Sequence, residues 1–277
     1  MTHKASQHMQ RITRKVMRRI VAIALVFAGF LLLWQAIAAS GLFPPVLLPA
    51  PLDVAYALVE LLQSGALMEH AVASVMRVLA GFILAAFLAI PLGITFGWYK
   101  QLGSAFYPLI QVLRTISPIA WIPLAILWFG IGDAPAIFII FITAFFPILI
   151  ATMHARRHID PALVKTAINF GASGRDLLLK IIFPASFPYV MVGLRIALGI
   201  AWVIVVAAEM VGMRSGLGFM ILDARNFLRT DLVIAGMVSI GVIGFVLDTL
   251  MSSFERRVER HKQQVENILN LKEEATT

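Results

Sequence analysis

The sequence has no cysteine, and it is poor in charged residues. Only 14% of its 277 residues are Asp, Glu, Lys or Arg, whereas 60% are hydrophobic. The missing thiols exclude disulfides, thiol nucleophiles and thiolate metal sites. The scarcity of charge excludes an ordinary soluble domain, because a chain of this length cannot bury so much apolar surface in its own core. We therefore expect the excess apolar surface to face lipid.

Acidic residues are scarcer than basic ones. Fifteen acids against 23 bases give a net charge of +8. Basic proteins often bind nucleic acid, but here the bases lie in the gaps between apolar stretches and form no basic surface interleaved with aromatic residues. We therefore expect the chain to interact with a lipid bilayer and with no nucleic acid.

Six apolar stretches are long enough to cross a bilayer. They cover residues 20–39, 73–98, 104–129, 134–153, 187–212 and 232–253. Prolines interrupt several of them, which membrane helices tolerate when neighbouring groups satisfy the freed backbone atoms. The third stretch is the least regular, because Ser117-Pro118 and Ile122-Pro123 can divide it into two short helices. The predicted fold is an all-α, polytopic membrane protein with about six transmembrane helices.

The first stretch follows a basic segment, and Ala36-Ile37-Ala38 resembles the cleavage site of a signal peptide. However, the apolar run from Ile20 to Ala39 is about 20 residues long, whereas the cores of signal peptides are shorter. We therefore expect a first helix that is retained.

Lys and Arg are distributed unevenly between the two sides of the predicted bilayer. With the N-terminus inside, the outer segments hold only Arg214, Arg225 and Arg229. Because cytoplasmic segments carry the excess of Lys and Arg, both termini are expected in the cytoplasm. The predicted organisation is a basic cytoplasmic N-terminus (1–19), a transmembrane domain (20–253) and a cytoplasmic, helical tail (254–277). On the outer side, apolar residues at helical spacing predict a short surface helix over 52–63.

The inner segment 160–184, between the fourth and fifth stretches, has the clearest local signals. Asp160-Pro161 is typical of a helix start, because Asp caps free N–H groups and Pro fits the first helical position. Gly171 is a natural helix stop. These signals predict a short helix that is too polar to cross the bilayer.

A second short helix is expected directly afterwards. Ser173 and Asp176 have the spacing of a capping box, and Pro184 and Pro188 are expected to end the helix. An ordinary connector is the alternative interpretation. Connectors are usually shorter and lack so many capping signals. The segment is therefore predicted to be a rigid helical hairpin that docks onto a cytoplasmic partner.

The residues of this segment resemble those of a known family. The loop contains Lys165-Thr166-Ala167, Gly171-Ala172-Ser173, Ile181 and Phe183-Pro184, which are similar to the Glu-Ala-Ala…Gly…Ile-x-Leu-Pro loop of binding-protein-dependent ABC transporter permeases. The resemblance covers about residues 48 to 257. Further motifs resemble the aliphatic sulfonate/nitrate/taurine branch: Leu48-Pro49-x-Pro51, residues 126–133, Gly193-Leu194-Arg195, Ala208-Glu209, residues 216–220 and Thr230-Asp231.

The resemblance implies a type I ABC importer permease, a non-catalytic subunit that forms the path for a small anion of the sulfonate, taurine, nitrate or bicarbonate class. It implies a second copy of the chain, two cytoplasmic ATPase subunits and an extracytoplasmic solute-binding protein as partners, in a bacterial cytoplasmic (inner) membrane. ATP and Mg²⁺ would be bound by the ATPase, so we expect no cofactor and no metal in this chain.

In this family the loop is the coupling helix, which inserts into a cleft of the ATPase. By resemblance, the coupling residues are Lys165, Thr166, Ala167, Asn169, Phe170, Gly171, Ala172, Ser173, Arg175 and Asp176. Lys165 departs from the pattern, because the family has a glutamate there. The shape of the loop carries over to this chain, but an ion pair at that position does not.

Four residues in the spans are candidates for lining the translocation path: Arg114, Arg195, Trp202 and Glu209. A charge deep in a membrane costs about 2.5–3.5 kcal/mol, so Glu209 requires a partner or water. It is either a gate residue or the partner of Arg77, Arg114 or Arg195 in an ion pair. Arg114 and Arg195 would favour an anion if they faced a cavity, while Arg195 can instead reach the cytoplasmic surface.

Two other classes of protein are alternatives. An ATPase-independent secondary transporter or channel would need paired inverted repeats and a buried ion site. An intramembrane enzyme would need a Ser/His pair, paired Asp residues or a metal constellation within the spans. The sequence shows none of these patterns. His154 and His158 have a spacing that can bind metal, but without a carboxylate they indicate a basic membrane-surface segment.

Overall fold

The computed structural model describes residues 2–274, with side chains for residues 17–18 and 21–258. The described chain is nearly all helix and contains no strand. Within the described residues, five helices are long and apolar enough to cross a membrane, and there are six spans if one bent pair of helices counts as a span. The predicted all-α fold with about six spans is therefore confirmed. The chain forms two compact units. Unit 1 comprises the chain up to Ser64 together with Ala224–Ala235, and unit 2 comprises Gly65–Asp223 and the chain from Gly236 onward.

Unit 1 contains α1 (Thr2–Ala39), α2 (Pro51–Gln63) and the start of α11 (Thr230–Glu274). The short helix predicted over 52–63 is present as α2, and the carboxylate of Asp53 accepts a 3.0 Å bond from the backbone N–H of Ala50 at its start. Helix α1 runs without a break through residue 20, and α11 does so through residue 254. The predicted limits of the transmembrane domain, residues 20 and 253, therefore fall inside helices α1 and α11. The structure does not mark these limits, and they stay predictions.

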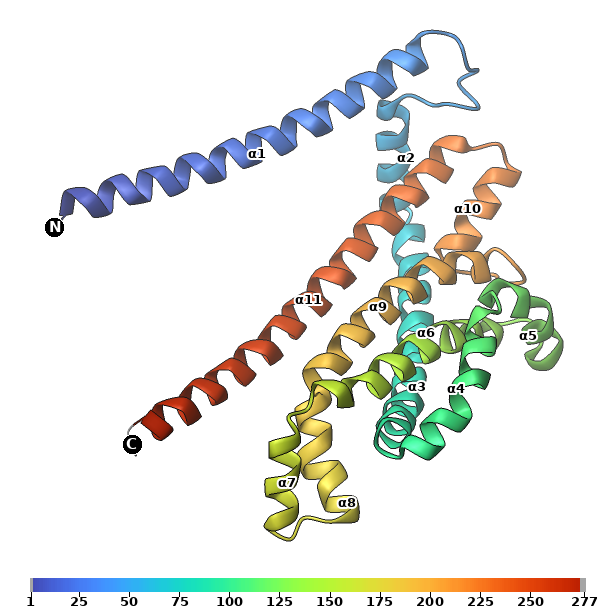
Figure 1. The fold of residues 1–277 in the computed structure, drawn as a ribbon. Coiled ribbons are helices and arrows are strands. Elements are labelled where there is room, and N and C mark those ends of the chain that lie inside the picture. The colour runs from blue at the N-terminus through green and yellow to red at the C-terminus, as the bar shows by residue number, and fades with distance from the viewer. Residues whose placement is uncertain (1, 275–277) are drawn as a thin grey trace. The chain divides into compact units, whose positions relative to one another are not determined.

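The core of unit 2 is made by α3 (Ala66–Trp98), α6 (Asp133–Ala155) and α9 (Phe183–Glu209), with α6 packed against both others (Figure 1). Glycines on α3 allow α6 to approach closely. A Cβ at Gly93 would lie 2.6 Å from the Cβ of Thr152, and a Cβ at Gly81 would collide with Ile140 in the same way. Small residues are a common means of close helix packing in membranes.

The third predicted span is broken. Helix α4 (Lys100–Thr115) and the segment formed by a 3₁₀ turn (Pro118–Trp121) and α5 (Ile122–Phe129) meet at 83°. Ile116 and Ser117 are extended, with ψ of 121° and 129°. Because a proline disfavours helical geometry in the residue before it, Pro118 fixes the position of the break. The expected division into two short helices is confirmed.

The predicted hairpin begins with α7 (Pro161–Asn169). A carboxylate oxygen of Asp160 accepts a 2.8 Å bond from the N–H of Ala162, which confirms the helix start. At the other end Gly171 has φ +87°, and the N–H of Ala172 donates to the carbonyl of Ala167. This is the Schellman arrangement, in which a glycine in the left-handed region closes the last turn.

The second half of the hairpin, α8 (Gly174–Asp176), differs from the prediction at its start. The side chain of Ser173 makes no capping bond. Asp176 pairs instead with Lys180, at 3.0 Å and one turn further along. The predicted capping box was therefore wrong, and the carboxylate of Asp176 points along the helix to Lys180 rather than back to Ser173.

The predicted helix end at Pro184 and Pro188 was also wrong. Residues Gly174–Glu209 form one helical span of 36 residues, in which a π-helical segment, Leu177–Ile182, joins α8 to α9. A proline has no N–H, so the regular ladder of hydrogen bonds cannot pass through Pro184. The wider π turn absorbs this defect, and Pro188 is accommodated within α9.

Candidate functional site

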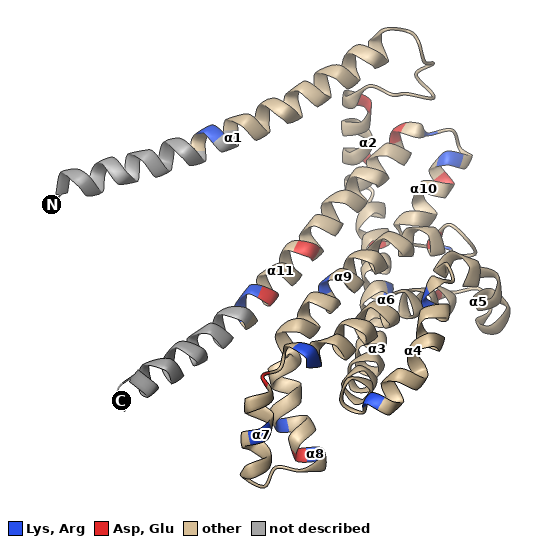
Figure 2. Cartoon of the chain, in the orientation of Figure 1, with Lys and Arg blue, Asp and Glu red and all other residues tan. Residues whose placement is uncertain are grey.

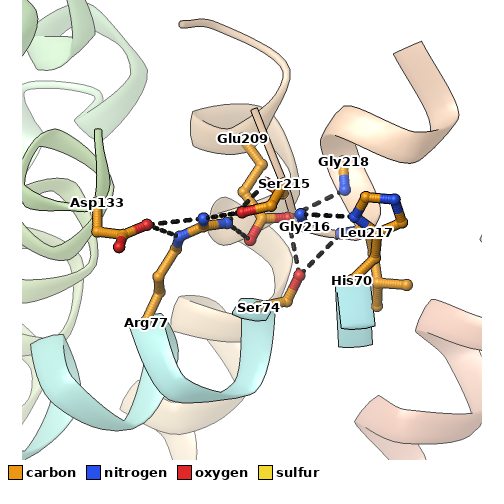
Figure 3. A network of polar contacts seen from close by, with 9 residues as sticks. All are labelled: His70, Ser74, Arg77, Asp133, Glu209, Ser215, Gly216, Leu217 and Gly218. Atoms are coloured by element: carbon orange, nitrogen blue, oxygen red, sulfur yellow. Dashed lines mark hydrogen bonds and ion pairs between the residues drawn. The ribbon is translucent and has the colours of Figure 1, made fainter. Parts of the chain in front are cut away.

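A buried polar network in unit 2 joins α3 to the end of α9 and the loop that follows it (Figure 3). The guanidinium of Arg77 and the carboxylate of Glu209 are 2.8 Å apart, and their side chains are only 6% and 0% exposed. Ser74 Oγ donates to Glu209 at 2.9 Å, and the N–H of Gly218 donates to it at 3.0 Å. Both carboxylate oxygens of Glu209 therefore have partners, as a buried charge requires.

Arg77 also connects the network to α6 and to the loop after α9. It contacts Asp133, the first residue of α6, at 2.7 Å, and it donates to the carbonyl and the hydroxyl of Ser215 at 2.8 Å and 2.6 Å. The side chain of Asp133 is 66% exposed, so the network reaches the surface there. Arg77 uses the fork geometry of a guanidinium to hold three segments together.

Glycines after α9 allow the backbone to approach Glu209. Gly216 has φ +109°, and a Cβ there would overlap the carboxylate of Glu209. The N–H of Gly216 donates to Nδ1 of His70, 3.1 Å away on α3. The loop is therefore folded tightly over the buried ion pair, and only a residue without a side chain fits at this position.

Glu209 is one of the four residues predicted for the translocation path. Of the three bases considered as its partner, Arg77 holds that position, while Arg114 and Arg195 lie elsewhere. Ser74, Asp133 and Ser215 were not foreseen as members of the network. These three residues are far apart in the sequence, so no spacing pattern predicts that they meet. Asp133 is nevertheless the last residue of the motif at 126–133 that resembles the family.

Arg195, the second path candidate, pairs with two acids of α11. It contacts Asp248 at 2.9 Å and Glu255 at 3.2 Å. Trp202, the third candidate, donates from its indole N–H to the carbonyl of Ile240 on α11 at 3.1 Å. Both side chains line a small pocket of about 150 Å³, which Gly244 of α11 also lines. They therefore share the side of α9 that faces α11.

Arg114, the fourth candidate, is in a different setting. It lies in the last turn of α4 and lines a groove of about 490 Å³ between the break in the third span, α6 and α9. The rest of the lining is apolar apart from Thr143. Among the residues whose side chains are described, no Asp or Glu forms an ion pair with Arg114. Its charge thus remains available in the groove.

The ten predicted coupling residues lie on α7, α8 and the turn between them, and none of them is buried. The phenyl ring of Phe170, at the turn, is 88% exposed. On the inner side of the hairpin, Ile159, Leu177 and Ile182 form a buried cluster, against which Trp98 of α3 packs. The hairpin therefore has its own core and is anchored to α3.

Charge and position distinguish the two ends of unit 2. In Figure 2 the bases of α7, α8 and the start of α4 lie at the hairpin end, and Figure 1 shows α10 (Leu217–Asn226) away from that end. The Glu209 network lies at the other end of the 36-residue helix that begins in the hairpin. At 1.5 Å per residue, this helix separates the two features by about 50 Å.

Comparisons with known proteins agree with the motifs. The family described as binding-protein-dependent transport system inner membrane component matches residues 81–260. The chain is 42% identical over 253 residues to a putative ABC transporter permease protein of Methanocaldococcus jannaschii, covering 90% of this chain and 93% of that protein. It is 36% identical over 239 residues to a putative aliphatic sulfonates transport permease protein of Bacillus subtilis (86% and 87%). It is also 36% identical over 245 residues to a bicarbonate transport system permease protein of Synechococcus elongatus (84% and 87%).

Proposed function

This chain belongs to the binding-protein-dependent transport system inner membrane components, and we propose that it works as one of two identical permease subunits in an ATP-driven importer. Two cytoplasmic ATPase subunits would bind ATP and Mg²⁺ and supply the energy. An extracytoplasmic solute-binding protein would deliver the substrate. The hairpin end of unit 2 and both termini would lie in the cytoplasm, and the membrane would be a bacterial cytoplasmic membrane.

Family membership confirms the predicted resemblance to ABC transporter permeases. The chain is an integral membrane protein of a transport family, and its relatives are permeases rather than enzymes. The alternative of an ATPase-independent secondary transporter or channel has no support among these relatives.

The observation that carries the proposed coupling role is the exposed ring of Phe170 on a hairpin with its own core. A large apolar side chain at the tip of a polar hairpin is suited to a pocket on a partner protein. Capping at Asp160 and Gly171 holds the tip in one shape. A partner protein would therefore bind a hairpin tip of fixed conformation.

The continuous helix from Gly174 to Glu209 supports a way in which motion could spread from the hairpin. A pull on α8 would reach α9 without passing through a flexible connector. At the far end of α9, the pairing of Glu209 with Arg77 would pass the movement to α3 and, through Asp133, to α6. ATP-driven closure of two ATPase subunits would thus shift the packed helices as a unit.

The groove beside Arg114 supports the proposal that the substrate is an anion. A guanidinium that has no ion-pair partner among the described side chains, in a lining that is apolar apart from Thr143, attracts negative charge and repels cations. Two of the three relatives reported above are named for aliphatic sulfonates and for bicarbonate, which are anions at neutral pH. We propose that this chain carries a small anion of the sulfonate, taurine, nitrate or bicarbonate class along a path that includes this groove.

Co-purification with the partner ATPase tests the coupling role. Phe170→Asp is expected to abolish ATPase binding, because it places a charge in an apolar pocket. Phe227→Asp is a matched control, since its ring is 74% exposed but lies outside the hairpin. Normal ATPase binding by the Phe170 variant would overturn the docking role, and uptake into liposomes without any ATPase would overturn the importer itself.

A further inference from the structure

Three bases at the hairpin end of unit 2 converge on two adjoining pockets. Lys100, Arg156 and Arg157 line both of them. The first pocket, of about 720 Å³, lies between the corner joining α3 to α4 and the end of α6. The second, of about 440 Å³, extends to α7, where Lys165 adds a fourth base. Because the two pockets share these three bases, we treat them together and call them the basic pocket.

The bases of the basic pocket carry charges that the described side chains do not neutralise. In the region 21–258, where side chains are described, no carboxylate forms an ion pair with Lys100, Arg156, Arg157 or Lys165. The ion pair described in the hairpin joins Asp176 of α8 to Lys180 of the π-helical segment instead. Four like charges around two adjoining pockets repel one another, so a bound anion would relieve this repulsion.

Packing holds part of the basic pocket in place. The guanidinium of Arg156 lies 5.0 Å from the centre of the Trp98 ring, which itself packs on the hairpin core. Gly103 gives α4 room to pass α3 at the corner, because a Cβ there would overlap the carbonyl of Phe96. The wall is thus shaped by close helix packing and by a cation–π contact, which orients one guanidinium in advance.

The general excess of bases on the cytoplasmic side explains why positive charge lies at this end. It does not explain why four bases gather around two adjoining pockets. Arg257 is an exposed base on the same proposed side, and it lines neither pocket. The orientation of the chain alone accounts for its charge.

We propose that the basic pocket binds a phosphate-bearing anion. Arg156 and Arg157 offer planar forks of N–H donors that match phosphate oxygens, and Lys100 offers a point charge. The source of the phosphate is a lipid headgroup or a free phosphate ion. Phe96 and Met153 also line the first pocket and give it apolar surface beside the bases. A bound phosphate would bridge Lys100 and Lys165 and so brace the base of the hairpin.

The experiment uses the full-length chain in nanodiscs. In the lipid arm, nanodiscs contain phosphatidylcholine with phosphatidylglycerol, and native mass spectrometry counts the phosphatidylglycerol molecules that stay bound. In the free-anion arm, inorganic phosphate is titrated into nanodiscs of phosphatidylcholine alone, and the thermal midpoint of unfolding is measured. Saturable binding in the first arm assigns the pocket to a lipid headgroup, and saturable stabilisation in the second assigns it to a free phosphate ion.

Two matched variants decide whether the pocket is responsible. Arg157→Gln is expected to weaken binding about fivefold, as removal of one basic contact near a membrane surface does. Arg157 is exposed, so this change leaves the packing intact. Arg257→Gln removes the same charge outside the pocket and is expected to leave binding unchanged. Equal losses in both variants, or no saturable binding in either arm, would overturn the proposal.

Discussion

Arg77 on α3 and Glu209 at the end of α9 are 132 residues apart in the sequence, yet they form an ion pair of 2.8 Å that is almost fully buried. Burying two charges costs several kcal/mol per ion, which the attraction between them offsets only when other hydrogen bonds are satisfied. Ser74 and Gly218 supply those bonds to the carboxylate. The pair therefore links α3 to α9, Arg77 also reaches α6 through Asp133, and the loss of either Arg77 or Glu209 would leave a buried charge without its partner.

We expect Glu209→Gln to lower the stability of the subunit. The amide keeps the volume of the side chain but leaves Arg77 without its buried counter-charge, a loss of about 3–5 kcal/mol for pairs of this kind. The decrease in the thermal midpoint of unfolding in detergent measures this loss of stability. Asp176→Asn is the control, because Asp176 lies in the polar hairpin, its side chain is 65% exposed and its pairing with Lys180 is screened by water. Equal shifts of the thermal midpoint in the two variants would contradict the conclusion that the buried pair of Glu209 and Arg77 stabilises the subunit.

We expect Gly216→Ala to destabilise the same network from the backbone side. The new Cβ would overlap the carboxylate of Glu209, and the backbone at this position has φ +109°. Gly241→Ala is the matched control, because a Cβ at Gly241 meets nothing within 4 Å. Alanine in a helix is favoured over glycine by about 1 kcal/mol, so the control should be neutral or slightly stabilising. A neutral Gly216 variant would mean that the loop can move away from Glu209.

The sequence predicted the features that depend on local patterns. Hydropathy located the spans, Pro118 located the break in the third of them, and Asp160 and Gly171 located the ends of α7. These signals act within a few residues, so they can be read without knowing the tertiary structure. The resemblance likewise depended on short motifs, and family membership confirms it.

The features that the sequence did not predict depend on contacts between distant residues or on competing local ones. Three bases were equally plausible partners for Glu209, and only helix packing selects Arg77. Pro184 is normally a stop signal, but a π turn lets the helix continue past it. Asp176 had two available partners, the backbone at Ser173 and the side chain of Lys180, and the structure shows the ion pair with Lys180.

We expect Gly171→Pro to uncouple the hairpin from the ATPase while the subunit still inserts in the membrane. Gly171 has φ +87°, whereas proline fixes φ near −65°, so the turn that presents Phe170 would be lost. Substrate-stimulated ATP hydrolysis in reconstituted liposomes measures the effect. Gly171→Asn should retain most of this stimulation, because asparagine tolerates the left-handed region better than other residues with side chains. Full stimulation in the proline variant would contradict the role of a fixed hairpin tip.

Arg114 gives the sharpest test of the proposed path, because it lines the groove without a carboxylate partner among the side chains described. An anion passing within about 4 Å of a guanidinium gains between 1 and 4 kcal/mol, depending on how much water remains. Arg114→Gln should therefore reduce anion uptake about tenfold, which corresponds to ~1.4 kcal/mol. Its thermal midpoint should stay unchanged, because no ion pair is broken. Arg114→Lys keeps the charge and should restore most of the uptake. If the two variants transport equally well, the charge at this position does not act on the substrate, and the path must avoid the groove.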